Sequence, residues 1–465
     1  MSLHGLDALA RAIGEAAIVA DPAQLAARRH DYWALSHLRD HVGRPAPVPG
    51  VLVRPTGVAQ VQEVVRFAAE RRVALIPFGL GSGVVGGVIA SPDAILLDLS
   101  ELKRVRFIDA TNLMAGFDAG HNGLAAEEAV AAQGLTIGHW PQSVAVSSVG
   151  GWVATRASGQ LSTGYGNIED ILHTVEAVLP NGELVTLGKG PRASAGPDLR
   201  QLMLGSEGAL GVITGVVVSL RRQPEAKAFS CFEAPDMRTG FELQREIVQR
   251  GWRPPVMRQY DARESRRQDG DATGCLLLMA HEGPAGLVAA ETAAVRDLAA
   301  AAAAPERPGE IVARWFSHRN VVPSWDTLLS RGLVVDTVEV SAGWTDIGAV
   351  YDDAVAALKG IDGLIAGSAH SSHVYRSGLN LYFTFAVQTT DPDQMEPAYL
   401  EGWRRILDAT ARHGGSISHH HGIGRVRRDW LAGEIGPSGV ALLRKIKSAL
   451  DPQGIMNPGV LIPDA

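Results

Sequence analysis

The segment Pro77-Phe-Gly-Leu-Gly-Ser-Gly83 decides how the rest of the chain is interpreted. It continues the apolar run 73–78, which predicts a short buried strand. Together with Gly81-Ser-Gly-Val-Val-Gly86 it matches the GxGxxG pattern of dinucleotide-binding βαβ units, which requires a helix that starts inside the motif. Only a few residues, Pro92 among them, precede the next expected strand at 94–99, so no crossover helix fits. We therefore reject the NAD-type interpretation of this motif.

The glycine-rich segment still has two interpretations, a tight turn without a ligand or a cradle for a diphosphate. Glycines allow backbone N–H groups to crowd a concave surface, which suits a diphosphate. Further segments rich in glycine and hydroxyl side chains occur at 141–151, 155–159 and 205–214. A surface loop does not need so many small residues beside apolar ones, whereas a large flat cofactor lying against the backbone does. The sequence therefore favours a cofactor site.

Composition and charge limit the class of protein. The chain has 465 residues, of which 46% are hydrophobic and 20% charged, so we expect a globular protein with more than one domain. The net charge of -7 argues against a nucleic-acid or anionic-membrane binder. The two cysteines cannot form a disulfide framework and fit no metal motif. We see no transmembrane run and no signal peptide, so we expect a cytoplasmic protein.

Changes in composition and in the expected secondary structure divide the chain into four segments, and the predicted fold is of the α+β class. We expect an N-terminal helical segment at 1–46, a two-part cofactor domain at 47–223, a cap or substrate domain at 224–436, and a helix and tail at 437–465 that return to the cofactor domain. In the cap we expect an antiparallel sheet with helices on one face. Its expected strands lie near 227–232, 275–280, 333–341 and 379–387, and its expected helices near 238–250, 285–304, 345–358 and 395–413.

Several longer stretches identify a resemblance. They include Gly150-Gly-Trp-Val-Ala-Thr-Arg-Ala-Ser-Gly159, Tyr165-Gly-Asn-Ile-Glu-Asp170, Gly205-Ser-Glu-Gly208 and Ser418-His-His-His-Gly422. Over nearly its whole length the chain resembles the vanillyl-alcohol-oxidase-type FAD flavoproteins, which have an FAD-binding domain of the PCMH type. Within them it is most similar to the branch of alkylglycerone-phosphate synthase and its bacterial relatives. The resemblance implies an enzyme with FAD as its cofactor.

The resemblance also implies which residues line the FAD. They are Pro77, Phe78, Gly79, Leu80, Gly81, Ser82, Gly83, Gln142, Ser143, Val144, Ala145, Val146, Ser147, Ser148, Gly151, Thr155, Arg156, Ala157, Ser158, Glu207, Gly208, Ala209, Leu210, Gly211, Val212, Ile213 and Asn457. The 77–83 segment would wrap the diphosphate. It offers neither His nor Cys, so we expect the FAD to be bound non-covalently.

The triplet His419-His420-His421 is the densest group of titratable side chains. The preceding Ile-Ser pattern suggests a strand, which would put His419 and His421 on one face and His420 on the other. Imidazoles suit proton transfer or anion binding beside a flavin. A metal site would need a further ligand, for which His373 or His370 is a candidate. We favour a catalytic or substrate-binding role and predict no metal.

Two further side chains are expected in the active site. Tyr382, on an expected strand, would be a core aromatic in the simplest interpretation. The resemblance places it at the position of the synthase's proton-donating tyrosine. Arg258 alone would be a surface charge, but it matches an arginine that the synthase needs for activity. A guanidinium there would orient an anionic or polar substrate.

The chain departs from the synthase where that enzyme has two substrate-binding arginines. An ungapped alignment puts Trp325 and His370 at those positions. The proton-handling residues are thus kept while the anion-binding residues change, which favours a different, less anionic substrate, although Arg319 or Arg331 could compensate. Relatives that oxidise D-2-hydroxy acids have Glu-His where this chain has His420-His421, and a His where it has Tyr382.

Three functions follow as hypotheses. The leading one is FAD-dependent oxidation of a small hydroxylated substrate, a hydroxy acid or an alcohol, by hydride transfer to the flavin. The first alternative is exchange of an acyl for an alkyl group on acyl-dihydroxyacetone phosphate, as in ether-lipid synthesis. The second is a metal-assisted D-2-hydroxyacid dehydrogenase. The electron acceptor would be oxygen or another carrier, and a homodimer stays open.

Overall fold

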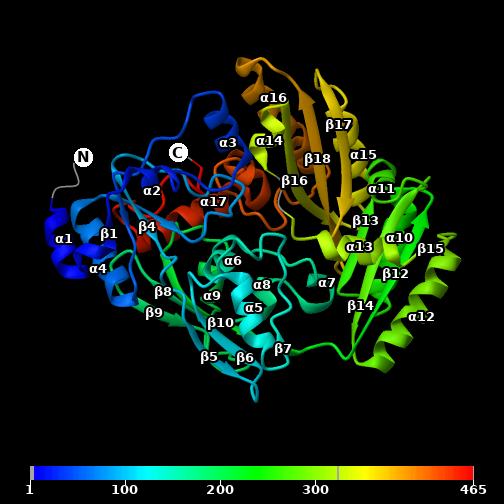
Figure 1. Cartoon of the computed structure of the whole chain (residues 1–465), viewed down its shortest axis with the longest axis horizontal. Coiled ribbons are helices and arrows are strands. Elements are labelled where there is room, and N and C mark those ends of the chain that lie inside the picture. Colours follow the sequence, from blue (N-terminus) through cyan, green and yellow to red (C-terminus); the bar gives the residue numbers. More distant parts are fainter. Residues whose placement is uncertain (1–4, 322–323, 464–465) are drawn as a thin grey trace.

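The computed structural model describes residues 5–321 and 324–463. Two halves lie side by side in Figure 1, one built on two small sheets and the other on one large sheet. The first half contains the N-terminus and the tail at the C-terminal end of the chain. The second half is built largely from the middle of the chain.

The glycine-rich segment leaves a four-stranded sheet ordered β1-β2-β4-β3. Its strands are β1 (Ile18–Val19), β2 (Val51–Val53), β4 (Ala94–Asp98) and β3 (Ala74–Phe78). α4 (Val58–Arg71) joins β2 to β3, and it buries the apolar face that its spacing predicts. β3 and β4 pair in parallel without a helix between them, which confirms the rejection of the NAD-type motif.

The second small sheet is five-stranded, in the order β5-β6-β10-β8-β9. The apolar run 211–220, which fits one long strand or two, forms the single strand β10 (Val212–Ser219) at the centre of this sheet. Its neighbours were not predicted: β5 (Val105–Asp109), β6 (Met114–Asp118), β8 (Leu172–Val178) and β9 (Leu184–Leu187). A separate two-stranded sheet pairs β7 (Leu135–Thr136) with β11 (Arg221–Arg222). The helices of this half are α1 (Leu6–Ile13), α2 (Pro22–Ala26), α5 (Gly123–Ala131), α6 (Val149–Thr155), α7 (Ser162–Tyr165), α8 (Ile168–Ile171) and α9 (Arg200–Met203), and a 3-10 turn covers Glu15–Ala17.

The cap half has a seven-stranded antiparallel sheet, ordered β15-β12-β14-β13-β17-β18-β16. Its strands are β15 (Glu306–Arg307), β12 (Ala226–Ala234), β14 (Cys275–Gly283), β13 (Val256–Tyr260), β17 (Leu364–Ser371), β18 (Gly378–Gln388) and β16 (Leu333–Gly343). The four expected strands are confirmed. β13 and β17 are additional, and they carry Arg258 and His370.

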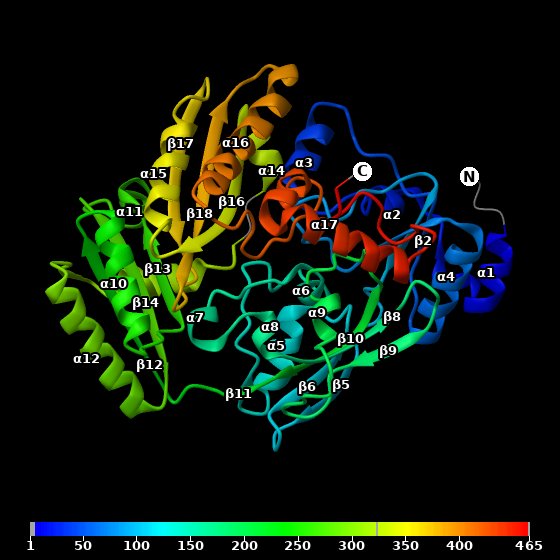
Figure 2. The same ribbon diagram turned by 180° about the vertical axis from the view of Figure 1, so that it is seen from behind.

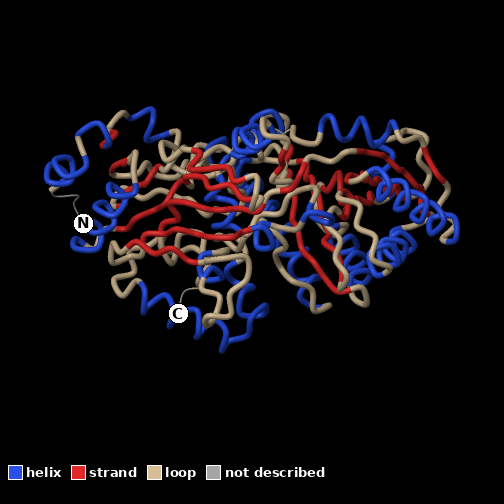
Figure 3. Tube along the Cα trace, turned by 90° about the horizontal axis from the view of Figure 1, so that it is seen from below, coloured by secondary structure: helices blue, strands red, loops and turns tan. Residues whose placement is uncertain are grey.

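Long helices cover one face of this sheet, as expected. Figure 2 shows α10 (Met237–Gln249), α12 (Ala285–Ala301), α15 (Ile347–Leu358) and α16 (Pro392–Arg412) in front of the strands. Shorter helices are α11 (Ala262–Gln268), α13 (Glu310–His318) and α14 (Trp325–Leu329). In Figure 3 the strands of both halves run through the interior and helices lie around them.

Both ends of the chain connect the halves. α3 (Ala34–His41) packs on the cap, where the Trp33 indole donates a hydrogen bond to the Tyr399 hydroxyl at 2.8 Å. After the 3-10 turn Arg428–Trp430, α17 (Leu431–Leu450) leads to the tail. Leu75 N–H donates to the Ile455 carbonyl at 2.8 Å, so the tail returns to the first half as predicted. None of the helices in the described part of the chain is long and apolar enough to span a membrane.

Candidate active site

The histidine triplet lies at the junction of the two halves, in an irregular turn between α16 and α17. The predicted strand over these residues is wrong. A carboxylate holds the turn instead, because Glu339 Oε1 accepts the backbone N–H of His420 at 3.1 Å and of His421 at 2.8 Å. It also accepts the Ser418 hydroxyl at 3.1 Å. These bonds, rather than a β-ladder, fix the direction of each imidazole.

Glu339 in turn forms a buried ion pair with Arg427, and neither side chain is exposed to solvent. Arg427 also donates to the Gly422 carbonyl at 2.7 Å, which closes the turn from its other end. Burial alone would raise the pKa of Glu339, but Arg427 and His421 hold it well below its usual range. The carboxylate is therefore charged, and as an anion it can only accept hydrogen bonds.

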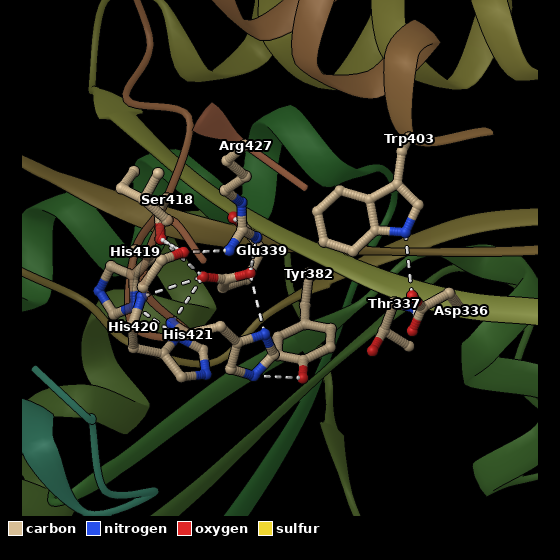
Figure 4. A network of polar contacts seen from close by, with 12 residues as sticks. Asp336, Thr337, Glu339, Tyr382, Trp403, Ser418, His419, His420, His421 and Arg427 are labelled. Carbon is tan, nitrogen blue, oxygen red and sulfur yellow. Dashed lines mark hydrogen bonds and ion pairs between the residues drawn. The ribbon is translucent and has the colours of Figure 1, made fainter. Parts of the chain in front are cut away.

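A polar chain runs from Tyr382 through His421 to Glu339 (Figure 4). The Tyr382 hydroxyl lies 3.0 Å from His421 Nε2, and His421 Nδ1 lies 3.0 Å from Glu339 Oε2. Because the ionised carboxylate cannot donate, it favours a proton on the ring nitrogen beside it, Nδ1, and Nε2 is then free to accept from the hydroxyl. Burial raises the pKa of Tyr382, so the phenol keeps its proton. This order of groups, the Tyr-His-Glu chain, can pass a proton in either direction.

Arg258 and His370 meet beside this chain, and Figure 1 shows their strands β13 and β17 as neighbours in the cap. Arg258 Nη2 donates to His370 Nε2 at 2.6 Å, and His370 Nδ1 donates to Glu264 at 2.8 Å. Burial, with a further contribution from Arg258, lowers the pKa of His370, so its ring is neutral and can accept. The His370 ring stacks on the Tyr382 ring, with centroids 5.1 Å apart and planes at 6°. The structure thus brings three predicted site residues together.

The other two histidines of the triplet turn toward each other. The Nδ1 atoms of His419 and His420 lie 2.8 Å apart, and the two rings flank the buried His373. One ring nitrogen from each of these three residues lies within 4.8 Å of the others. Burial lowers the pKa of His419 to about 4, which keeps its imidazole neutral and able to ligate. The predicted faces are therefore also wrong, since His419 and His420 turn toward each other, and of the triplet in this described region only His421 hydrogen-bonds to the Tyr382 hydroxyl.

The segments predicted to line FAD converge. A Cβ on Gly79 would lie 2.4 Å from Ser148 Oγ, and one on Gly208 would lie 3.1 Å from Pro77. Gly81 has φ +74°, a conformation that favours glycine. The backbones of the 77–83, 142–151 and 205–213 segments therefore form one wall that only small residues allow. Such a wall fits a flat cofactor.

This wall is tied to the histidine turn and retains polar atoms for a ligand. The Glu207 carboxylate accepts the N–H groups of Ile423 and Gly424, at 2.7 and 2.8 Å. Asn457 Nδ2 donates to the Glu207 carbonyl at 2.6 Å. Within the described residues, the buried Asn457 Oδ1 and Ser206 Oγ have no hydrogen-bond partner. Glu207 thus acts on the turn through its side chain, and the unpaired oxygens suit the polar groups of FAD.

A second polar route joins the wall to the triplet. Ser158 Oγ hydrogen-bonds to Asn167, whose Nδ2 donates to the Tyr375 hydroxyl at 2.9 Å. That hydroxyl lies 2.7 Å from His419 Nε2. Ser158 is one of the residues predicted to line the FAD, so the cofactor wall and the histidines form one continuous polar network.

Not every predicted site residue joins this group. The Trp325 indole donates to the Tyr32 carbonyl at 3.2 Å and lies against the N-terminal segment. Arg156 is exposed and pairs with Glu169 at 3.3 Å. Their roles in binding substrate and FAD stay predictions.

Sequence analysis did not single out Glu339, Arg427 or Tyr375. One signal was available, because Glu339 is a carboxylate flanked by two valines in a strand, and a buried carboxylate requires a partner. No pattern links Glu339 to Arg427, since 88 residues separate them.

The fold and the site define a class, a protein with a wall suited to a flat cofactor in one half and a cap built on an antiparallel sheet in the other. Comparison with protein families agrees. Residues 49–188 match the FAD binding domain, and residues 223–461 match the C-terminal domain of the FAD linked oxidases. The chain belongs to the FAD-linked oxidase family, its cofactor is FAD, and it is an enzyme.

Individual relatives cover most of the chain. An uncharacterized FAD-linked oxidoreductase of Escherichia coli (strain K12), YgcU, is 33% identical over 90% of this chain and 90% of its own length. Alkyldihydroxyacetonephosphate synthase of Dictyostelium discoideum is 29% identical over 92% of this chain and 75% of its own. A solved alkyldihydroxyacetonephosphate synthase structure superposes with a TM-score of 0.80 at 26% identity, over 97% of this chain and 85% of that one.

Proposed function

We propose that this enzyme oxidises a small hydroxylated substrate, a hydroxy acid or an alcohol, with non-covalently bound FAD as the hydride acceptor. The observation that carries the proposal is the Tyr382-His421-Glu339 chain, which ends beside Arg258. Oxidation of a hydroxyl group releases a proton as well as a hydride. Bound FAD supplies the hydride-accepting chemistry. The protein must then supply orientation and a path for the proton.

Each residue of the site has a part in this scheme. Arg258 orients the substrate through its guanidinium, and the neutral His370 holds Arg258 in place. The Tyr382 phenol relays the substrate proton to His421 Nε2, while its own proton is replaced in the same step. Glu339 stabilises the imidazolium that forms, because it stays ionised and lies 3.0 Å from Nδ1. Arg427 keeps Glu339 charged.

The first alternative is the acyl-to-alkyl exchange named for the synthase relatives, and their similarity favours it. It requires space for a long acyl chain. The cavity beside Arg258 instead contains four arginines, Glu264 and three glutamines, which argues for a hydrophilic substrate.

The experiment that tests the proposal is anaerobic addition of a panel of hydroxy acids and alcohols, with flavin absorbance as the readout. Bleaching of the flavin by a member of the panel is the expected result. If no member bleaches it, while acyl-dihydroxyacetone phosphate and a long alcohol give an ether product, the exchange reaction is correct. Acid precipitation should release the flavin into solution, since we propose non-covalent binding.

The second alternative, a metal-assisted dehydrogenase, is favoured by the approach of His373, His419 and His420. Three imidazoles are a suitable ligand set for zinc. Elemental analysis of the purified protein separates the two schemes, because the Tyr-His-Glu chain needs no metal. A stoichiometric metal whose removal abolishes bleaching would favour this alternative.

A further inference from the structure

A cavity of about 550 Å³ reaches His370, whose ring stacks on Tyr382 of the Tyr-His-Glu chain. Arg258, Tyr260, Glu264 and His370 form its floor, and the last three are less than 9% exposed. Thr384 also lines it, two residues along β18 from Tyr382 and therefore on the same face of the strand. At about 30 Å³ per water, the cavity equals roughly 18 waters, more than a two-carbon hydroxy acid fills.

The cavity is strongly cationic in a chain whose net charge is -7. Four arginines line it, Arg258, Arg267, Arg314 and Arg319, against a single carboxylate, Glu264. Glu264 is already engaged by His370 at 2.8 Å. Within residues 5–321 and 324–463, none of the four arginines forms an ion pair with a carboxylate. The cavity therefore holds an excess of positive charge, which attracts an anion.

Arg319 shows this excess most clearly. Its guanidinium lies 3.8 Å from the centre of the Phe316 ring, and its Nε is buried without a hydrogen-bond partner among the described residues. Burial lowers the pKa of Arg319. Glu282 opposes this effect only in part, and Arg319 forms no ion pair with a carboxylate among the described residues. A desolvated cation in this state is costly, so an anion from outside the chain would complete it.

Two of the arginines lie at the rim rather than the floor. Arg267 and Arg314 are exposed, on α11 and α13, and Arg314 Nη2 donates to the Gln268 carbonyl at 2.8 Å. That bond ties the C-terminal end of α11 to the middle of α13 and places both guanidinium groups on one side of the cavity. The cavity thus has a cationic floor next to the Tyr-His-Glu chain and a separate cationic rim.

The wall between floor and rim is suited to hydroxyl groups. Gln142, Gln160 and Gln268 line it. Gln160 Nε2 donates to the Arg319 carbonyl at 3.0 Å, while its buried Oε1 has no partner in the described part of the chain. An amide oxygen in this state accepts a hydroxyl, and it disfavours an alkyl chain.

We infer that this cavity binds a polyhydroxylated carbon chain that carries a carboxylate or phosphate at the end remote from the oxidised hydroxyl. The remote anion lies against Arg267, Arg314 and Arg319, and the oxidised hydroxyl lies at the floor near Tyr382. The inference rests on the proposed function and gives its substrate class.

The test is calorimetric binding to the FAD-loaded enzyme, which needs no turnover. The probes are gluconate, sorbitol 6-phosphate, sorbitol and octanoate. We expect the two polyol anions to bind more tightly than sorbitol and octanoate, and more weakly as salt is raised. The ratio of gluconate to sorbitol 6-phosphate affinity shows which anion the site prefers.

Substitutions of the arginines test where in the cavity the anion binds. Arg267→Gln and Arg314→Gln should each weaken the better anion by up to about 5-fold, as for exposed charge pairs, and Arg319→Gln by about 10-fold or more. The matched control is Arg245→Gln, which removes a partly exposed arginine on α10 that does not line the cavity and should leave binding unchanged. Equal losses in Arg245→Gln and the rim variants, or tighter binding of octanoate, would overturn the inference.

The outcome also separates this inference from the proposed function. If anion binding depends on the rim arginines but no hydroxylated compound bleaches the flavin, the inferred binding site is supported and the proposed oxidation is rejected. If small hydroxy acids bleach the flavin but the rim arginines have no effect on the binding of polyol anions, the proposed oxidation is supported and the inferred binding site is rejected.

Discussion

Replacing Tyr382 by Phe separates the chemistry of the Tyr-His-Glu chain from the stability of the fold. The change removes one hydroxyl that lies 3.0 Å from His421 Nε2. It keeps the ring that stacks on His370 at 5.1 Å. A neutral hydrogen bond contributes only about 0.5–1.5 kcal/mol to stability, so the melting temperature should change little. FAD should stay bound, because Tyr382 is not among the residues of the cofactor wall.

The rate should fall far more than the stability. Loss of a positioned proton-transfer group costs about 10²- to 10⁴-fold in rate, which is about 2.7–5.4 kcal/mol of barrier. The assay is stopped-flow bleaching of the flavin under anaerobic conditions with the best substrate of the panel. The matched variant is Tyr375→Phe, which removes a hydroxyl 2.7 Å from His419 instead of His421. It should slow bleaching much less.

Two results would refute this reasoning. Unchanged bleaching in Tyr382→Phe would remove the phenol from the mechanism. An equal loss in Tyr375→Phe would mean that the proton leaves through His419, Asn167 and Ser158 rather than through Glu339.

Three other predictions concern the turn and the cofactor wall. Glu339→Gln should lower the free energy of unfolding by about 3–5 kcal/mol, because it leaves the buried Arg427 without a counter-charge. Adding Arg427→Met to this variant should recover part of the loss, and urea unfolding measures both effects. Burial raises the pKa of Glu207 to about 7, so the folded protein holds this proton longer than the unfolded chain, and stability falls as pH rises from about 4.5 to 7. Glu207→Gln should flatten that slope in thermal melts, and an unchanged slope would contradict the assignment. Gly81→Ala places an L-residue at φ +74°, which costs about 1–2 kcal/mol, and should weaken FAD binding about tenfold. Gly270→Ala, where an added Cβ meets no atom within 4 Å, is the control and should leave FAD binding unchanged. An equal loss in both variants would contradict the placement of FAD against the 77–83 segment.

Local patterns predicted much of the fold. The apolar spacing of α4 and the apolar character of β12, β14, β16 and β18 are properties of short segments, so the sequence shows them directly. The strands β13 and β17 were not predicted, because neither segment shows a long apolar pattern. Both lie inside the sheet, where pairing with neighbouring strands decides the conformation. The cost was substantial, since these two strands bring Arg258 and His370 together.

The site shows the same division. The sequence by itself determined the small residues of the cofactor wall, since Gly79 and Gly81 admit no side chain, and it determined the identity of Tyr382 and the histidines. It did not determine the conformation of the triplet. A strand was the local expectation, but Glu339 binds the backbone of His420 and His421 and converts it into a turn.

Only the tertiary structure decided which histidine hydrogen-bonds to Tyr382 and which charged side chains lie together in the site. Glu339 and Arg427 are 88 residues apart, and each needs the other because an isolated charge cannot be buried. The arginines of the cavity likewise come from β13, α11, α13 and the segment after α13. Hydrophobic spacing is a local quantity that a sequence displays, whereas electrostatic partnership depends on distances that exist only after the chain has folded.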